Sequence, residues 1–379
     1  MSTIKVNKIE NTATADGGIA IDSSGHVQVD GQQLPTTGPL SNRNLIINGA
    51  MQVAQRSTSE TGQTTLDGYV ALDRHRIQLS SSGTFTISQS TEAPSGFANS
   101  LKFDCTTADS SPDYVVFFQL LEGQDLQQVQ KGTSSAQKLT ASFYVRSSKT
   151  GTYQVNIRDL DNNRLVGASY TIGSADTWEL KTVTFPADTT GAFGNDANAS
   201  LQLEWWLAAG SDYTGGAVPT AWEARVNTDR AAALNVAIGA STADDFYITG
   251  IQLEVGEKAT PFEHRSYGDE LARCQRYFYA YELLGVTLVG GNTALCNGSV
   301  YFPVKMRAAP TLTSTSVDRM TNIGEANHNG TYTFGSNIVE RTHCAINYSR
   351  SSGDTWNQGT PLSINDTGGS TIMNITAEL

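Results

Sequence analysis

Short apolar segments with a period-two pattern recur along most of this 379-residue chain, and they restrict its fold more than any other feature. Clear examples are residues 139–145, 179–185 and 245–254, with polar turns rich in Gly, Asn, Asp and Ser between them. Alternation of apolar and polar side chains puts one face of a strand in a core and the other toward solvent. From Asn44 to about Arg265 the pattern therefore predicts a mainly β fold, as an antiparallel β-sandwich or jelly roll.

Helical periodicity is clearest in one segment, residues 267–278. Asp269 and Glu270 stand in its first turn and two arginines near its end, an arrangement that complements the helix dipole. Strand patterns resume after this segment, so we expect a short connecting helix followed by a separate, smaller β domain. Residues 229–237 are compatible with either a short helix or a loop of small residues.

The first forty residues contain three very short alternating bursts, which begin at Ile4, Ile19 and Val27. Each burst is too short to form an independent sheet. Three copies of the chain wrapped around a common axis would bury such small apolar faces, whereas the alternative is a disordered tail. Residues 34–39 then bring two prolines and a glycine, which predict a boundary or hinge.

These patterns divide the chain into three expected parts. Residues 1–40 form a short-stranded N-terminal segment that assembles as a trimer. Residues 41–265 form the sandwich. Residues 266–379 form the connecting helix and a C-terminal β domain.

The charge balance limits the classes of partner. The chain has 25 Lys and Arg against 37 Asp and Glu, a net charge of −12, and no cluster of basic residues, so we expect no nucleic-acid partner. Only 16% of the residues are charged, against roughly 25% in an average soluble protein, which disfavours a cytosolic metabolic enzyme. No stretch approaches the roughly 18–20 apolar residues that cross a bilayer, and the first residues lack a signal-peptide core. We therefore expect neither membrane insertion nor Sec export.

The four cysteines occur without a CxxC pair and without the spacing of a metal site. A free cysteine behaves as a small hydrophobic residue, so buried free thiols are predicted for all of them. They are Cys105, Cys274, Cys296 and Cys344.

Several longer motifs occur in a fixed order along the chain. They are NLIINGAMQVAQR at residues 44–56, Gly68-Tyr69, Asp73-Arg74, IQLEVG at 251–256, TPFE at 260–263, SYGDELARCQRY at 266–277 and FPVKMRAAP at 302–310. This series resembles a family of phage tail fibres that have jelly-roll, carbohydrate-binding-like domains. The leader MSTIKVNKIEN is similar to N-terminal segments of fibres from phages of marine bacteria and cyanobacteria. His75 departs from the family pattern, which usually carries a tryptophan there.

The resemblance implies a homotrimeric virion protein that is made in the host cytoplasm and assembled into a phage tail fibre. Its N-terminal segment would bind an adaptor, nozzle or baseplate protein of the tail, and its C-terminal tip a glycan or other receptor on the host surface. Alternatives are a capsid-attached fibre or decoration protein without a dedicated receptor site, a polysaccharide depolymerase, and a cellular carbohydrate-binding adhesin.

The residues of these motifs also have structural interpretations. Residues 45–47 are expected to form a buried first strand, and Asn48-Gly49 a tight turn or bulge. Asp73 and Arg74 are expected to brace the fold.

Two polar residues in the motif at 251–256 are expected on the same face of a strand. Gln252 and Glu254 alternate with apolar neighbours, so they share one strand face, where they would contact loops or a neighbouring subunit.

Catalytic motifs do not emerge from the sequence. It lacks HExxH, GxSxG, P-loop and GxGxxG patterns, and it lacks the repeats of roughly 20–30 residues that depolymerases tend to carry. Carboxylate pairs near in sequence are favoured as solvated turns; they are Asp159 with Asp161, Asp244 with Asp245, and Glu122 with Asp125. We therefore predict no enzyme activity, no catalytic residues and no cofactor or metal site. Calcium is an alternative at residues 104–113 and 159–163, where a plain turn is the favoured interpretation.

Sugar binding requires exposed aromatic faces flanked by polar groups. Adjacent Trp205 and Trp206 must point to opposite strand faces, so one is expected in the core and the other exposed or at an interface. Core packing or a trimer contact is the alternative for each aromatic residue. The candidate receptor contacts are Trp206, Tyr213, Tyr332, Phe334, Tyr348 and Trp356.

Overall fold

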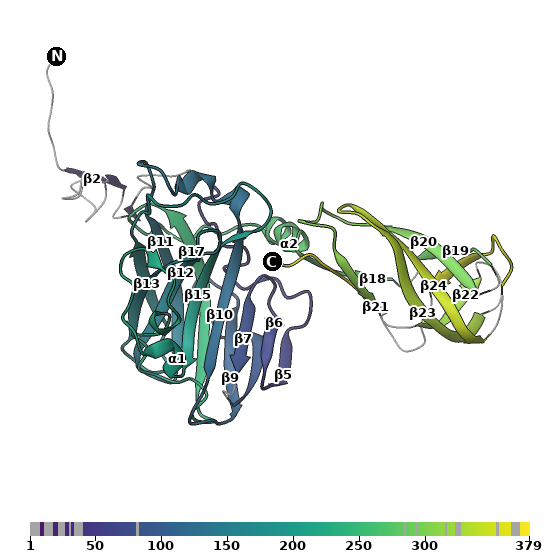
Figure 1. The fold of residues 1–379 in the computed structure, drawn as a ribbon, viewed down its shortest axis with the longest axis horizontal. Helices are drawn as coiled ribbons and strands as arrows, with labels where there is room; N and C mark the ends of the chain where they lie inside the picture. The colour runs from purple at the N-terminus through teal and green to yellow at the C-terminus, as the bar shows by residue number, and fades with distance from the viewer. Residues whose placement is uncertain are drawn as a thin grey trace, which may run out of the picture. The chain divides into compact units, whose positions relative to one another are not determined.

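The computed structural model is mainly β, and the predicted fold class of antiparallel sheets is confirmed (Figure 1). The chain divides into two compact units, Met1–Ser266 and Tyr267–Leu379. The hinge expected at residues 34–39 lies outside the described residues. The structure describes residues 8–10, 18–21, 27–29, 32–33, 41–80, 83–283, 286–292, 294–314, 317–322, 327–353, 356–364 and 372–379.

Four short strands near the N-terminus pair into one antiparallel sheet. In spatial order they are β1 (Lys8–Glu10), β2 (Gly18–Ile21), β3 (Val27–Val29) and β4 (Gln32–Gln33).

One face of this N-terminal sheet is apolar. Directly paired residues of an antiparallel sheet share a face, and the register pairs Ile9 with Ile19, Ile19 with Val29, and Ile21 with Val27. These five side chains are between 36% and 61% exposed. The opposite face is formed by Lys8, Ala20 and Gln28. The sheet therefore presents an apolar surface that the described part of the chain leaves exposed.

The sandwich pairs a seven-stranded sheet with a six-stranded sheet (Figure 1). The seven strands, in spatial order, are β16 (Glu223–Ala224), β13 (Arg164–Ile172), β12 (Gly151–Asp159), β15 (Ala199–Ala209), β10 (Tyr114–Glu122), β7 (Arg76–Ser80) and β6 (Leu66–Tyr69). The six are β14 (Glu179–Phe185), β11 (Leu139–Ser147), β17 (Asp245–Val255), β9 (Ser100–Thr107), β8 (Thr84–Ser90) and β5 (Ser59–Gln63).

Aromatic packing between the two sheets forms the core. Trp205 of β15 stacks on Phe117 of β10, with ring centroids 5.0 Å apart and planes 4° apart. Phe143 of β11 meets the same indole edge to face at 5.6 Å. Such pairs contribute about 0.5–1.5 kcal/mol each beyond the area they bury. The prediction that Trp205 and Trp206 point to opposite faces is confirmed, because Trp206 belongs to a separate cluster outside this core.

The strand expected at residues 45–47 is wrong. Ile46 and Ile47 are buried there, but amide side chains satisfy much of their backbone. Asn44 Oδ1 accepts a hydrogen bond from Ile46 N at 2.9 Å, and the Gln119 amide exchanges two hydrogen bonds of 2.8 Å with the backbone of Ile47. Because side chains occupy these groups, the segment is not a regular sheet strand.

The tight turn predicted at Asn48-Gly49 is confirmed. Asn48 has a φ of 60°, and its side chain closes the turn through hydrogen bonds of 2.9 and 2.8 Å with the backbone of Val53. Gly49 O accepts a hydrogen bond of 2.9 Å from Ile251 N of β17. A Cβ on Gly49 would lie 2.1 Å from Ile251 O. Glycine is therefore required where the turn meets the sheet.

Asp73 and Arg74 brace the fold, as predicted. Asp73 Oδ1 accepts a hydrogen bond of 3.0 Å from Gln55 N, and Arg74 Nη2 donates one of 2.7 Å to Leu120 O. His75 is buried beside them, and burial lowers its pKa to about 4, so its ring is neutral.

The second unit begins with α2 (Tyr267–Gln275), which confirms the predicted helix. Residues 229–237 form a loop, since only η3 (Asn227–Asp229) touches them. The remaining short helices are η1 (Gly123–Asp125), η2 (Gln127–Val129) and α1 (Ser211–Thr214). Among the described residues, no helix has the length and apolar character needed to span a membrane.

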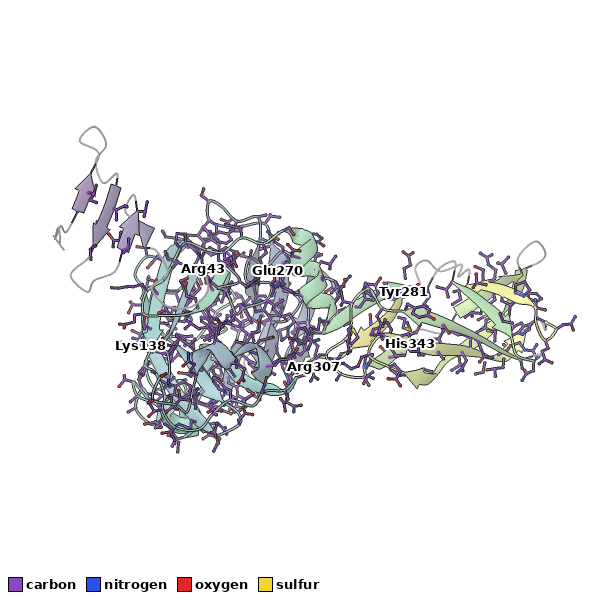
Figure 2. The ribbon with its side chains drawn as sticks, turned by 90° about the horizontal axis from the view of Figure 1, so that it is seen from above. Arg43, Lys138, Glu270, Tyr281, Arg307 and His343 are labelled. Atoms are coloured by element: carbon purple, nitrogen blue, oxygen red, sulfur yellow. The ribbon has the colours of Figure 1, made fainter. Side chains whose placement is uncertain are left out.

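The described strands of the second unit surround a core of their own. Arg307, which is labelled in Figure 2, ties the chain end to this unit by donating to Ala377 O at 2.8 Å and Glu378 O at 3.0 Å. A three-stranded sheet contains β18 (Phe278–Glu282), β26 (Ile372–Thr376) and β21 (Thr311–Ser314). A closed barrel contains β19 (Thr287–Gly290), β20 (Leu295–Tyr301), β24 (His343–Gly353), β23 (Asn327–Val339), β22 (Val317–Asn322) and β25 (Pro361–Ile364). The four cysteines are buried free thiols, as predicted.

We expect Gly49→Ala to lower the free energy of unfolding of the sandwich by about 1–3 kcal/mol, because the added Cβ collides with the Ile251 carbonyl. Gly68→Ala is the matched control, since its Cβ would meet no atom closer than 3.9 Å and the expected change is within about 0.5 kcal/mol. Urea unfolding followed by tryptophan fluorescence measures both. Equal stability of the two variants would contradict the assigned contact.

Candidate functional site

A groove of about 610 Å³ lies on the outer face of the six-stranded sheet. Its floor consists of the outward-facing residues of β11 and β14, which alternate with the core residues of the same strands. The register sets Ser142 beside Thr182 and Tyr144 beside Leu180. Leu180 is 55% exposed. The floor therefore offers one pair of hydroxyl groups and one pair of apolar groups.

Aromatic rings line the side of the groove. Phe97 lies at their centre, with its ring centroid 5.5 Å from Tyr144, 5.0 Å from Phe262 and 5.2 Å from His264. Phe262 and His264 meet edge to face at 4.8 Å. The phenyl and phenol rings are half-buried, and His264 is exposed. We call the space bounded by these rings and the β11–β14 floor the aromatic groove.

Gly250 of β17 makes room for the rings. It has a φ of 63° at the position where the pairing of β11 with β17 shifts register. A Cβ on Gly250 would lie 2.7 Å from the Phe97 ring and 3.1 Å from the Tyr144 ring. The bulge therefore lets both rings approach the sheet.

The loop that carries Phe262 is anchored by Gln252 and Glu254. Thr260 donates to the two carboxylate oxygens of Glu254 from its N–H at 2.8 Å and from its hydroxyl at 2.7 Å. Gln252 Oε1 accepts a hydrogen bond of 2.8 Å from Glu263 N. The prediction that these two strand residues contact a loop is confirmed, and the loop is the wall of the aromatic groove.

Glu263 fixes the far end of this wall. Its Oε2 accepts a hydrogen bond of 3.0 Å from Asn44 N. Burial opposes its ionisation, but backbone hydrogen bonds from Asn44 and Arg43 and the charge of Arg265 lower its pKa below the ordinary value. The TPFE motif thus supplies both a groove ring and its anchors.

The candidate contacts in the second unit are mostly buried, contrary to their expected exposure. Tyr332, Tyr348 and Trp356 are at most 4% exposed within the core of that unit, while Phe334 is half-buried against it. The hydroxyl of Tyr332 donates to His328 O at 3.1 Å. Barrel closure explains the difference, because one face of each strand turns inward. Whether any of these residues touches a receptor stays a prediction.

Of the two candidate contacts in the sandwich, Trp206 lies under a loop and Tyr213 belongs to that loop. Trp206 is 1% exposed, because Tyr213 and Arg230 cover it at 4.8 and 4.7 Å from its ring. Tyr213 is half-buried. The strand pattern correctly turned Trp206 outward, but residues 211–235 close over it.

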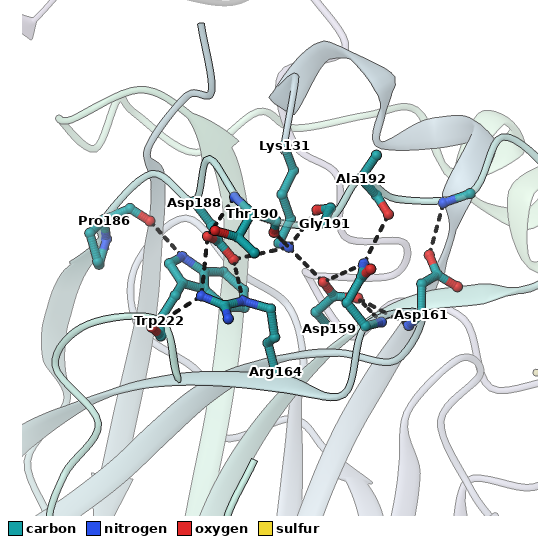
Figure 3. Close-up of polar contacts among 12 residues, drawn as sticks. Lys131, Asp159, Asp161, Arg164, Pro186, Asp188, Thr190, Gly191, Ala192 and Trp222 are labelled. Carbon is teal, nitrogen blue, oxygen red and sulfur yellow. Dashed lines mark hydrogen bonds and ion pairs between the residues drawn. The ribbon is translucent and has the colours of Figure 1, made fainter. Parts of the chain in front are cut away.

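Calcium was the alternative at residues 159–163, and the structure places the ammonium group of Lys131 beside this loop. Figure 3 shows Lys131 pointing between Asp159 and Asp188, which it meets at 2.6 and 3.0 Å. The same ammonium donates to the carbonyls of Thr190 and Gly191 at 2.8 Å each. All of its hydrogen-bonding capacity is therefore used within the chain.

The carboxylates around this ammonium have further partners. Asp159 Oδ1 accepts hydrogen bonds of 3.0 Å from the backbone N–H groups of Asp161 and Asn162, which closes the turn between β12 and β13. Arg164 Nε donates to Asp188 at 2.8 Å. The favoured interpretation of residues 159–163 as a turn is confirmed. In the part of the chain that the structure describes, no group of three or more His, Cys, Asp or Glu residues has the arrangement of a metal site.

The sequence patterns did not predict the aromatic groove. Phe97 and Tyr144 have no motif around them, and His264 stood out only as one of five scattered histidines. The signal that could have pointed to it was Phe262 within TPFE, together with Gly250 in an otherwise regular strand.

No protein-family model and no curated protein matches the sequence. Among solved structures, the chain is similar to the enzymatically active domain of tailspike protein 4 of bacteriophage CBA120, with 13% identity and a TM-score of 0.30. The match covers 56% of this chain and 21% of that one.

The chain is also similar to two carbohydrate-binding modules. One is the C-terminal family 22 module of a Clostridium thermocellum protein, with 10% identity, a TM-score of 0.30, and coverage of 58% of this chain and 99% of that one. The other is a family 11 module of the same organism in complex with a β-1,3-1,4-mixed-linked tetrasaccharide, with 9% identity, a TM-score of 0.27, and coverage of 54% and 99%. Similarity at these TM-scores transfers neither a ligand nor an activity.

We expect Lys131→Ala to destabilise the sandwich by about 3–5 kcal/mol, because it leaves two buried carboxylates without their ammonium. Lys138→Ala is the matched control. Lys138 lies at the edge of the sandwich (Figure 2) and pairs with Glu257 at 3.0 Å while both side chains remain about half exposed, so the expected change is at most about 1 kcal/mol. Thermal unfolding of both variants tests the difference, and similar losses would contradict the structural role of Lys131.

Proposed function

We propose that the aromatic groove is a binding site for an uncharged glycan. The observation that carries the proposal is the meeting of the Phe97, Tyr144 and Phe262 rings with the Ser142 and Thr182 hydroxyls in one groove. Aromatic faces pack on the C–H faces of pyranose rings, and a few placed polar groups orient the sugar hydroxyls. Its volume of about 610 Å³ falls within the roughly 300–1,000 Å³ of ligand pockets.

We infer that the glycan-binding chain is a non-enzymatic subunit of a phage tail fibre that adsorbs to a bacterial surface. The support is the ordered series of motifs that resembles such fibres, of which IQLEVG and TPFE build the groove wall. The N-terminal segment would dock on a tail adaptor, nozzle or baseplate protein. A capsid-attached fibre without a receptor site remains the structural alternative.

The apolar face of the N-terminal sheet supports a trimer. Its five isoleucine and valine side chains are too few to form a core alone, and they are exposed on the single chain. The opposite face carries Lys8 and Gln28 and suits solvent. Three copies related by a common axis would bury the apolar faces against one another. Linked sites then bind at high effective concentration, so a weak individual sugar site suffices.

One carboxylate in each of two pairs that an alternative depolymerase would need is held by other partners. Asp244 Oδ2 accepts hydrogen bonds from Gly239 N and Ser241 N at 3.0 and 2.9 Å and pairs with Lys149 at 2.8 Å. Asp159 is held by Lys131. Release of reducing sugar ends from a bacterial capsule polysaccharide would favour the depolymerase over our proposal.

To test the groove, Thr182→Trp places an indole on its floor. Thr182 is an exposed residue of β14, so the fold is expected to persist while glycan binding falls at least tenfold. Thr171→Trp changes an exposed threonine of β13 outside the groove and should bind like the unchanged protein. An array of neutral bacterial oligosaccharides provides the readout. Retained binding by Thr182→Trp would refute the site.

To test the trimer, light scattering should give the full chain a mass near three times 40.6 kDa. Ile19→Asp puts a charge on the apolar face of the N-terminal sheet and should yield monomers, whereas Gln28→Asp on the opposite face should remain trimeric. A monomeric unchanged protein, or trimers of both variants, would argue against this interface.

A further inference from the structure

The outer face of the seven-stranded sheet contains a buried carboxylate whose hydrogen-bonding capacity is filled. Glu204 Oε1 accepts from Asn156 Nδ2 at 2.9 Å, Trp206 Nε1 at 3.0 Å and Arg230 Nε at 3.1 Å. Its Oε2 accepts from Gln202 Nε2 at 2.8 Å and Arg230 Nη2 at 2.7 Å. Burial opposes its ionisation, but Arg230 lowers the pKa of Glu204 to about 2. Glu204 is thus ionised and neutralises Arg230.

Two more arginines interact electrostatically with this pair, and among the described residues neither has an ion pair with another carboxylate. Arg158 Nη1 is 3.9 Å from Glu204, beyond hydrogen-bond distance, and donates instead to the neutral Gln202 amide at 2.9 Å. Arg225 Nη2 donates to the neutral side chain of Asn227. The Nε atoms of Arg158 and Arg225 are buried without a hydrogen-bond partner. Arg158 and Arg225 therefore add two positive charges near a carboxylate that Arg230 already neutralises.

The charges of these arginines act on one another. Burial, together with the charges of Arg230 and Arg225, lowers the pKa of Arg158 to about 10 despite the attraction of Glu204. Such mutual repulsion costs free energy in the unliganded protein, and a bound anion would relieve it. The chain as a whole has a net charge of −12, so this surplus is local.

Both arginines remain accessible from outside. The Arg158 side chain is 17% exposed, and Arg225 is half-buried. Gln202 and Asn227 hold one nitrogen of each guanidinium, so the side chains are already oriented before an anion arrives. A guanidinium can meet a carboxylate through two parallel hydrogen bonds, which makes arginine well suited to planar oxyanions.

We propose that Arg158 and Arg225 form a binding subsite for the carboxylate of an acidic sugar. The subsite lies on the seven-stranded sheet, whereas the aromatic groove lies on the six-stranded sheet, so the two proposals stand independently. A hexuronic acid residue within a surface polysaccharide has the required chemistry, since its carboxylate projects from the ring and is ionised at neutral pH.

The experiment is a calorimetric titration of the full chain with oligogalacturonate, with the neutral galactose oligomer as its uncharged counterpart. Only the uronate should bind at this subsite, and its affinity should fall about tenfold or more between 50 and 500 mM salt, because ionic contacts are screened. Arg158→Gln and Arg225→Gln should each weaken uronate binding at least tenfold. Arg146→Gln is the control, because Arg146 lies near Asp176 and Glu92 on the other sheet.

Thr182→Trp separates this subsite from the groove, since uronate binding should survive it. Thermal unfolding of each arginine variant checks its fold, and the salt dependence of the unchanged protein is a readout that needs no variant. Uronate binding that ignores salt and both arginine substitutions would overturn the proposal, as would an absence of binding. Equal binding of inorganic phosphate would overturn the preference for a carboxylate and assign the subsite to phosphate or sulfate esters.

Discussion

Aromatic packing between the two sheets is the interaction on which the rest of the sandwich depends. Trp205, Phe117 and Phe143 fill the space between strands that are far apart in sequence. Because these rings face inward, their neighbours along the same strands face outward. Ser142 and Tyr144 flank Phe143, and Glu204 and Trp206 flank Trp205 on the outer side of the other sheet. Both candidate binding surfaces are therefore a consequence of how the core is built.

The two outer faces are used in different ways. On the six-stranded sheet, the loop with Thr260 and Phe262 leaves a groove open over the strands, because buried Gln252 and Glu254 of the inner strand β17 anchor it. On the seven-stranded sheet, residues 211–235 cover the strands and bring Arg230 onto Trp206. The face of the six-stranded sheet thus exposes apolar rings and hydroxyls. The face of the seven-stranded sheet buries Trp206 and leaves the positive charges of Arg158 and Arg225 partly exposed. Different sugar chemistry is expected to suit each.

The sequence predicted what depends on local pattern, which includes the β class, helix α2, the Asn48-Gly49 turn and the opposite directions of Trp205 and Trp206. Its predictions were wrong or absent where contacts with distant segments determine the local structure or the exposure of a side chain. Residues 45–47 look like a strand, but Gln119 takes their backbone groups. Trp206 points outward as its position requires, yet a loop covers it. Phe97 and Phe262 meet although 165 residues separate them, and no periodicity within either segment encodes that contact.

The Lys131 ammonium described above ties together loops that carry Asp159, Asp188 and the carbonyls of Thr190 and Gly191. A bound divalent ion performing the same task would leave its site whenever its concentration fell well below its dissociation constant. A cation attached to the backbone cannot be diluted or removed by a chelator. These loops should consequently keep their arrangement whether divalent ions are abundant, scarce or removed by a chelator.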